Sequence, residues 1–272
     1  MTRQASVDPA EARAAVASTA GRLTGLLRSA TSPAAPALGE WDAADVAVHL
    51  SHAVDAVTAS ARGSESVLDD VWDLSTMSGL LVRGEATRDL SAIADRIEAG
   101  VATFLSVAES AAGDPSRSWL VKGVEVPMST LACQVLNELA VHGRDIAVAQ
   151  GAPWAIPRPH AALVLLGYLF PALDSLGGAM VDQQAAAGVR ATYEVRLRGG
   201  GRAFVRFDDG DLTVGAEPPG PIDCHLSVDP ETFLLVSWGR LGQWPAIGRG
   251  RLLAWGRRPW LGLRLREMLK NP

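Results

Sequence analysis

The chain has 272 residues, of which 48% are hydrophobic and 20% are charged, so its composition excludes a disordered or low-complexity protein. At roughly 150 residues per domain, this length predicts two domains, each with its own core. The net charge of −5 argues against bulk attraction of the whole chain to nucleic acid or to an anionic membrane.

Cysteine content and the first residues indicate a reducing compartment. Cys133 and Cys224 are too few for a disulfide scaffold. The opening MTRQASVDPAEARAA lacks the apolar stretch of a secretory signal. The longest apolar run, Ala161–Leu173, is too short to span a bilayer and contains Pro171, so it indicates a core helix. We therefore expect a cytoplasmic protein, and the rarity of lysine is typical of a GC-rich bacterial gene.

Four long helices are predicted in the first 150 residues from apolar residues at helical spacing. Asp8 and Pro9 mark the start of the first. Asp42, with Asp45 three residues later, marks the start of the second helix, and Ser129 is expected to cap the fourth helix. Residues 63–86 are ambiguous, because their central stretch VWDLSTMSGLLV is apolar without a clear pattern. The expected helices are Ala10–Leu27, Ala43–Ala61, Arg88–Ala111 and Thr130–Ala149.

The second half changes character near Ala185. A fifth helix is expected from Pro157 to about Met180, and alternating apolar residues then predict short strands. The fold class is therefore an N-terminal four-helix bundle, residues 1–184, followed by a small α+β domain, residues 185–272. The strands are expected at Ala191–Leu197, Ala203–Phe207, Leu212–Val214 and His225–Val228, with helices at 230–238 and 259–269.

One pair of side chains has the spacing of a metal site. Glu138 and His142 are four positions apart, so both project from one helix face and can hold one divalent ion. A third ligand must come from another helix. His49 is the natural candidate, and His52, one turn further on, is an alternative or a fourth ligand. Two histidines and one carboxylate suit a catalytic zinc ion, and they also suit Fe(II) or Ni(II).

The C-terminal tail is basic and rich in tryptophan. From Ser237 onward it has eight basic residues against Glu267 alone, with four tryptophans between them. We expect these tryptophans to pack in the core, while one or two arginines bind the carboxylate of a small molecule. A nucleic-acid interface is the least favoured interpretation, because the overall charge is negative. Cys133 is expected to be a buried core residue rather than a nucleophile.

Two motifs resemble the DinB-like, mycothiol-dependent maleylpyruvate isomerase family. The first is the stretch from Trp41 through Asp45-Val46 to His49-Leu50, similar to the family's W-x-x-x-D-V-x-x-H-L. The second is Glu138–Asp145 (ELAVHGRD), where Arg144 replaces the usual tryptophan. The C-terminal part, with Asp229-Pro230 and Gly239-Arg240, looks like the sterol-carrier-protein-like domain appended in this family. Together the matches cover nearly the whole chain.

The resemblance implies a divalent metal, usually zinc, held by His49, Glu138 and His142, with mycothiol as thiol cofactor. It also implies a C-terminal domain closing over the site and a catalytic arginine, best matched by Arg240. The implied reactions are thiol-dependent cis–trans isomerisation and S-transfer on a small electrophile.

Two alternatives remain open: a specialised-metabolism enzyme acting on a bulky intermediate, and a non-catalytic small-molecule carrier. The expected partner is a small molecule, for which the tail arginines favour a carboxylate group, and neither nucleic acid nor membrane. The oligomeric state is left open.

Overall fold

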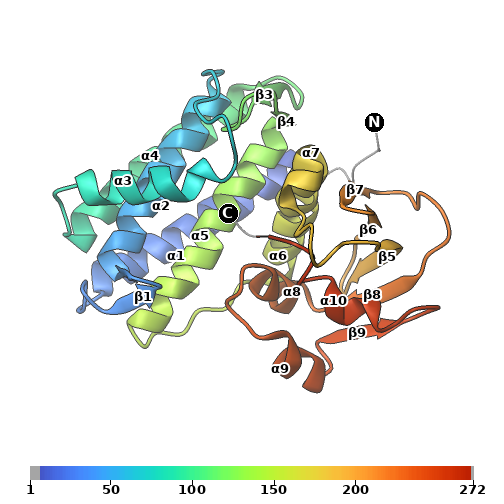
Figure 1. Cartoon of the computed structure of the whole chain (residues 1–272). Helices are drawn as coiled ribbons and strands as arrows, with labels where there is room; N and C mark the ends of the chain where they lie inside the picture. The colour runs from blue at the N-terminus through green and yellow to red at the C-terminus, as the bar shows by residue number, and fades with distance from the viewer. Residues whose placement is uncertain (1–6, 271–272) are drawn as a thin grey trace. The chain divides into compact units, whose positions relative to one another are not determined.

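The computed structural model describes residues 7–270, which form two compact units, Asp8–Ile156 and a second that begins at Pro157. Figure 1 labels the helices and strands of both units. The division falls at 156/157, before the expected boundary at 184/185. The physical reason is that helix α7 (Phe170–Leu176) packs on strand β7 (Asp211–Gly215), and the carboxylate of Asp174 accepts the backbone N–H of Val214 at 2.7 Å.

The N-terminal unit is the expected four-helix bundle. Its first and last helices pack on each other, and α2 and α4 complete the bundle around an aliphatic core. The Asp8 cap and the reciprocal Asp42–Asp45 capping box are both present, as predicted. The bundle helices are α1 (Pro9–Ser29), α2 (Ala43–Ala61), α4 (Leu90–Ser110) and α5 (Met128–Ala149).

The expected cap at Ser129 is wrong. Helix α5 begins at Met128, after Pro127, and the N–H and hydroxyl of Ser129 both donate to the carboxylate of Asp114 at 2.7 and 2.6 Å. The ambiguous stretch contains a twelve-residue helix, α3, which contacts α2. The smaller elements are α3 (Asp73–Gly84) and two antiparallel pairs, β1 (Pro36–Leu38) with β2 (Trp41–Asp42) and β3 (Ser116–Ser118) with β4 (Glu125–Pro127).

The C-terminal unit opens with helical segments followed by a mixed five-stranded sheet. The helical stretch 158–180 is interrupted by a π turn just before Pro171, which lacks the backbone N–H that a regular helix would use. By length and composition this stretch could cross a membrane, but half of its apolar window is buried, as in a core helix. The segments are α6 (Arg158–Val164), η1 (Leu165–Leu169), α7 and η2 (Gly177–Met180).

The sheet has the order β7-β6-β5-β8-β9, in which β5 and β8 run parallel and the other pairs are antiparallel. The four expected strands are present, and the edge strand β9 was not predicted. The helix expected at 230–238 is present as α8, the one expected at 259–269 is reduced to the four residues of α10, and α9 was not predicted. The remaining elements are β5 (Arg190–Leu197), β6 (Arg202–Asp208), β8 (Cys224–Val228), β9 (Leu252–Trp255), α8 (Pro230–Ser237), α9 (Gln243–Gly248) and α10 (Leu261–Arg264).

The tail tryptophans do not pack in the core as expected. The exposed fractions of Trp244, Trp255 and Trp260 are 63%, 41% and 58%. Between residues 241 and 266 the buried apolar side chains are those of Ala246, Leu261 and Leu265. This part of the chain therefore contributes small and aliphatic side chains to the core, while these three indole rings lie outside it.

Candidate metal centre

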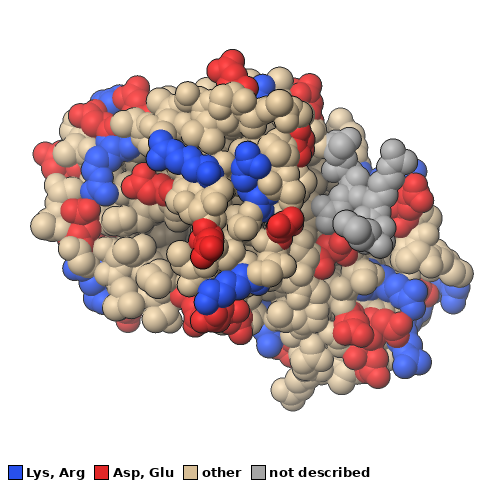
Figure 2. Space-filling view, turned by 90° about the horizontal axis from the view of Figure 1, so that it is seen from above, with Lys and Arg blue, Asp and Glu red and all other residues tan. Residues whose placement is uncertain are grey.

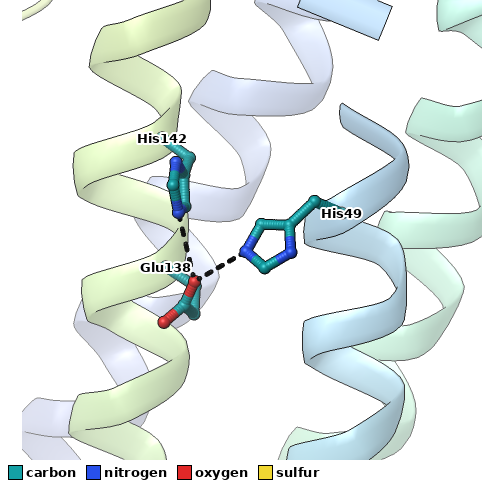
Figure 3. Close-up of side chains that lie close together, drawn as sticks. All are labelled: His49, Glu138 and His142. Atoms are coloured by element: carbon teal, nitrogen blue, oxygen red, sulfur yellow. Dashed lines mark ion pairs between the residues drawn. The ribbon is translucent and has the colours of Figure 1, made fainter. Parts of the chain in front are cut away.

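Helices α2 and α5 bring three potential metal ligands together. Glu138 and His142 lie on one face of α5, and His49 points toward them from α2 (Figure 3). Oε2 of Glu138 is 3.5 Å from Nε2 of His49 and 3.5 Å from Nε2 of His142. All three ligand atoms lie within 4.8 Å of one another. Within residues 7–270, no other group of three or more His, Cys, Asp and Glu side chains has this arrangement.

The spacing of these atoms fits a small divalent cation. A tetrahedral ion that binds its ligands at about 2.0–2.1 Å holds the ligand atoms about 3.3–3.4 Å apart. The two separations of 3.5 Å are close to that value. Imidazole nitrogen and carboxylate oxygen are both zinc ligands, and three protein ligands leave one coordination position for a small molecule.

The electrostatics of the cluster place two of its three side chains, Glu138 and His49, in the protonation state of a metal ligand. Burial alone would raise the pKa of Glu138, but the contacts with His142 and His49 outweigh it and hold that pKa well below its usual range. Burial opposes the charged form of His142, yet Asp145 and Glu138 raise its pKa to about 9. Burial lowers the pKa of His49. The carboxylate is therefore ionised and His49 is neutral at pH 7, which are the states that a metal ligand requires.

Asp145 supports the cluster and was not singled out from the sequence. Its Oδ2 lies 3.0 Å from Nδ1 of His142, and its side chain is 5% exposed. A carboxylate on Nδ1 fixes the ring so that Nε2 faces the metal. The sequence could have identified Asp145 as a partner of His142, because residues three positions apart lie on the same face of a helix.

Gly143 allows a tryptophan to pack directly on α5 beside the cluster. A Cβ atom at Gly143 would lie 2.9 Å from Cη2 of Trp154, so a side chain there would force the indole ring or the helix to shift. The indole N–H of Trp154 donates to the carbonyl of Ala140 at 3.0 Å, and the guanidinium of Arg22 lies over its ring. This packing fixes the turn of α5 that carries His142. A second aromatic ring, Trp41, lies against His49 with the ring centroids 5.3 Å apart.

The other candidates from the sequence lie elsewhere. Nε2 of His52 is 3.9 Å from Oε2 of Glu85, so His52 is not part of the three-residue cluster. Arg240 belongs to the C-terminal unit, where Nη1 donates to the carbonyl of Trp238 at 2.8 Å. Cys133 is fully buried, as expected, and burial raises the pKa of its thiol to about 12.

Two domain families match the chain. The Mycothiol maleylpyruvate isomerase N-terminal domain matches residues 10–147, and the SCP-2 sterol transfer family matches residues 174–256. No protein of curated function matches the sequence significantly.

Among solved structures, the mycothiol-dependent maleylpyruvate isomerase matches with 13% identity and a TM-score of 0.53, over 93% of this chain and 95% of that one. A variant of that enzyme with one histidine replaced by alanine matches at 12% identity with the same TM-score and coverage. The stereoselective inverting sec-alkylsulfatase Pisa1 from Pseudomonas sp. matches with 17% identity and a TM-score of 0.33. The match covers 53% of this chain and 25% of the sulfatase chain.

The isomerase match extends along both units and shows a shared fold. The domain profile matched to residues 10–147 covers the helices that carry all three clustered side chains. The chain therefore belongs to the mycothiol maleylpyruvate isomerase family, with an N-terminal helical domain of that family followed by an SCP-2-type domain.

Proposed function

We propose that this chain is a thiol-dependent enzyme that uses a divalent metal, zinc being the best match to the ligands, and mycothiol as its thiol. The observation that carries the proposal is the convergence of His49, Glu138 and His142 on one point. A cation bound there would lower the pKa of a thiol, so that the nucleophilic thiolate persists at neutral pH. Family membership supports an enzyme, and an isomerase first, since the matched relative is named as one.

The thiol has to come from outside the chain. Burial raises the pKa of Cys133 to about 12 and that of Cys224 to about 11, and both side chains are buried. Neither is a nucleophile at pH 7, because the thiolate is the reactive form. A small-molecule thiol is therefore required for thiol chemistry, which is consistent with the mycothiol dependence stated for the matched isomerase.

The proposal assigns a task to each residue of the cluster and to two residues outside it, Asp145 and Arg240. His49 and His142 supply neutral nitrogen ligands, and Glu138 supplies the negative charge. Asp145 holds the His142 ring in place from Nδ1. Arg240 is the proposed partner of a substrate carboxylate, a role that its guanidinium can fill by a bidentate contact.

The thiolate sulfur adds to one carbon of a cis alkene conjugated to a carbonyl, and the π electrons move to the carbonyl oxygen. Rotation about the resulting single bond and return of those electrons expel the thiolate and leave the trans alkene. In S-transfer the same sulfur attack displaces a leaving group instead. The two outcomes share their first step, so the ligand set fits both reactions.

Metal analysis of the full-length protein, followed by turnover assays, tests the proposal. We expect about one equivalent of divalent metal in the wild type and in His52→Ala, which lies one turn from His49 but outside the cluster. We expect His142→Ala and His49→Ala each to contain less than a tenth of the metal bound by the wild type. Full occupancy in His142→Ala would show that the ligand assignment is wrong, and negligible metal in the wild type would favour a carrier.

Turnover separates the two reactions. Maleylpyruvate is the probe for isomerisation and monobromobimane the probe for S-transfer, each with mycothiol, with glutathione and without a thiol. We expect activity that requires mycothiol and is lost together with the metal. Activity without any thiol would overturn the thiol dependence and leave the fold and family untouched.

A further inference from the structure

The C-terminal unit exposes an unusual set of large apolar side chains. Of its described residues, those with large, exposed apolar side chains all lie between positions 241 and 263, and we call them the Trp/Leu surface. Soluble proteins rarely expose such a concentration of tryptophan and leucine unless it contacts something. The surface consists of Leu241, Trp244, Leu253, Trp255, Trp260 and Leu263.

The elements that carry these side chains lie together at the β9 edge of the sheet (Figure 1). Trp255 pairs with His225 across β8 and β9, and Leu253 projects from the same face of β9. Helix α10 packs against the opposite face of β8 and β9, where a Cβ at Gly262 would lie 2.8 Å from Cβ of Ala254 and 3.0 Å from Cδ2 of Leu226. Helix α9 also contacts β9. The apolar side chains therefore flank one strand from both of its faces.

Positive charge accompanies the Trp/Leu surface. Residues 241–266 contain six arginines and no aspartate or glutamate. Residues 157–272 carry 14 basic against 11 acidic residues, whereas residues 1–156 carry 11 basic against 19 acidic. On the face of the molecule shown in Figure 2, both signs are interspersed. The negative net charge is thus a property of the N-terminal part, and the Trp/Leu surface lies in a locally cationic segment.

Local charge decides binding at short range, because physiological salt screens charges beyond about 8 Å. The net charge of the whole chain predicts no attraction to anionic surfaces, but it does not describe this segment. Arg257 and Arg251 are 68% and 46% exposed, and each contacts one acidic side chain at 3.6 or 3.3 Å. Both guanidinium groups remain partly open to solvent, Arg257 more than Arg251, and can contact an external anion.

We propose that the Trp/Leu surface docks the protein on anionic lipid bilayers as a peripheral contact, without crossing them. Tryptophan is enriched at the membrane–water interface, and leucine side chains enter the acyl boundary. Arginines beside them contact anionic headgroups. The inference concerns the C-terminal unit alone and does not depend on the metal centre or on the proposed reaction.

Other occupants fit these side chains less well. Bases of nucleic acids stack on aromatic rings, but the three exposed leucines offer nothing to stack on. Pairing of β9 with β9 of a second copy would bring Arg249 and Arg251 of one copy toward Arg257 and Arg258 of the other. Like charges opposed across strands destabilise such a pair, and arginines that flank an edge strand discourage self-association.

Vesicle co-sedimentation of the full-length protein tests this proposal. The probes are vesicles of phosphatidylcholine alone and of equal parts phosphatidylcholine and phosphatidylglycerol. We expect binding to the anionic vesicles only, weakened by added salt, with a blue shift of tryptophan emission. Reversing two arginine charges in Arg249→Glu/Arg257→Glu should weaken binding roughly 25-fold or more, since each basic residue near such a surface contributes roughly fivefold. Trp244→Ser/Trp260→Ser should abolish the blue shift that lipid causes.

The matched controls are Leu80→Ser and Arg83→Glu on α3, which remove an exposed leucine and reverse an exposed charge in the other unit. Both controls should bind vesicles like the wild type, and thermal melts should show every variant folded. Absence of wild-type binding at low salt would overturn the proposal. Equal losses in the α3 controls, retention of duplex DNA instead of vesicles, or a dimer that disappears in Trp244→Ser/Trp260→Ser would also overturn it.

Discussion

Oδ2 of Asp145 lies 3.0 Å from Nδ1 of His142, while Nε2 of the same ring faces Glu138 at 3.5 Å. The imidazole is thus held from both nitrogens by carboxylates that lie on the same helix. Glu138 belongs to the candidate metal cluster, and Asp145 lies on the far side of the His142 ring from it. The Asp145 side chain is almost completely buried, so its charge is poorly screened by water.

We predict that Asp145→Asn weakens metal binding by about 10- to 100-fold, because loss of a partner on the second ring nitrogen has this effect in metal sites. The fold should survive, since the amide occupies the same volume. Competition with a coloured chelator measures the affinity. Glu109→Gln, an exposed carboxylate on α4, is the control and should leave it unchanged. An unaltered affinity in Asp145→Asn would remove Asp145 from the site.

Metal binding at pH 7 should release about one proton. His142 has a pKa of about 9 without a cation and is protonated at pH 7, whereas His49 and Glu138 already have the states of metal ligands. The cation must displace the His142 proton, so apparent affinity should rise about tenfold per pH unit and level off near pH 9. Titration calorimetry in buffers of different ionisation enthalpy counts the protons. A release of none, or of two, would contradict the assigned charge states.

Gly143→Ala should destabilise the N-terminal unit by about 1–3 kcal/mol, because the new methyl group overlaps the Trp154 ring. The matched control is Gly25→Ala in α1, where nothing lies within 4 Å of the added Cβ. Gly25→Ala should stabilise the N-terminal unit by about 0.5–1 kcal/mol, because alanine has a higher helix propensity than glycine. Urea unfolding gives both values. A neutral Gly143→Ala would show that Trp154 moves aside freely.

Both native thiols should resist alkylation at pH 8. Burial keeps Cys133 and Cys224 protonated and shields them from reagents. Iodoacetamide should label neither within the time that labels Ser110→Cys, a cysteine placed at an exposed helix end. All thiols should react in urea. Rapid labelling of either native cysteine would reopen the question of a protein-derived nucleophile.

The features predicted well from the sequence are those that depend on local spacing. The caps at Asp8 and Asp42 act within one helical turn, so their residue types specify them. The Glu138–His142 pair follows from helix geometry alone, and the packing of α2 on α5 then brings His49 to it, as expected.

The features that were missed depend on long-range contacts. Strand β9 has no alternation, since three of its four residues are exposed, and only its pairing with β8 makes it a strand. The structural division at 156/157 differs from the expected 184/185, because the apolar residues of α7 predict a helix but do not reveal that it packs on β7. Ser129 was misassigned because Asp114, fifteen positions earlier, takes both of its hydrogen bonds.

The position of β5 in the sheet has a consequence for biosynthesis. Its antiparallel neighbour β6 follows after a tight glycine turn, but its parallel neighbour β8 comes only after β7 and a long connection. A nascent chain that has emerged as far as Gly215 can form the β5-β6-β7 meander, yet one side of β5 still lacks its ladder partner. We expect this half-built sheet to be the most aggregation-prone stage of translation, and truncations that end between β7 and β8 to accumulate in inclusion bodies.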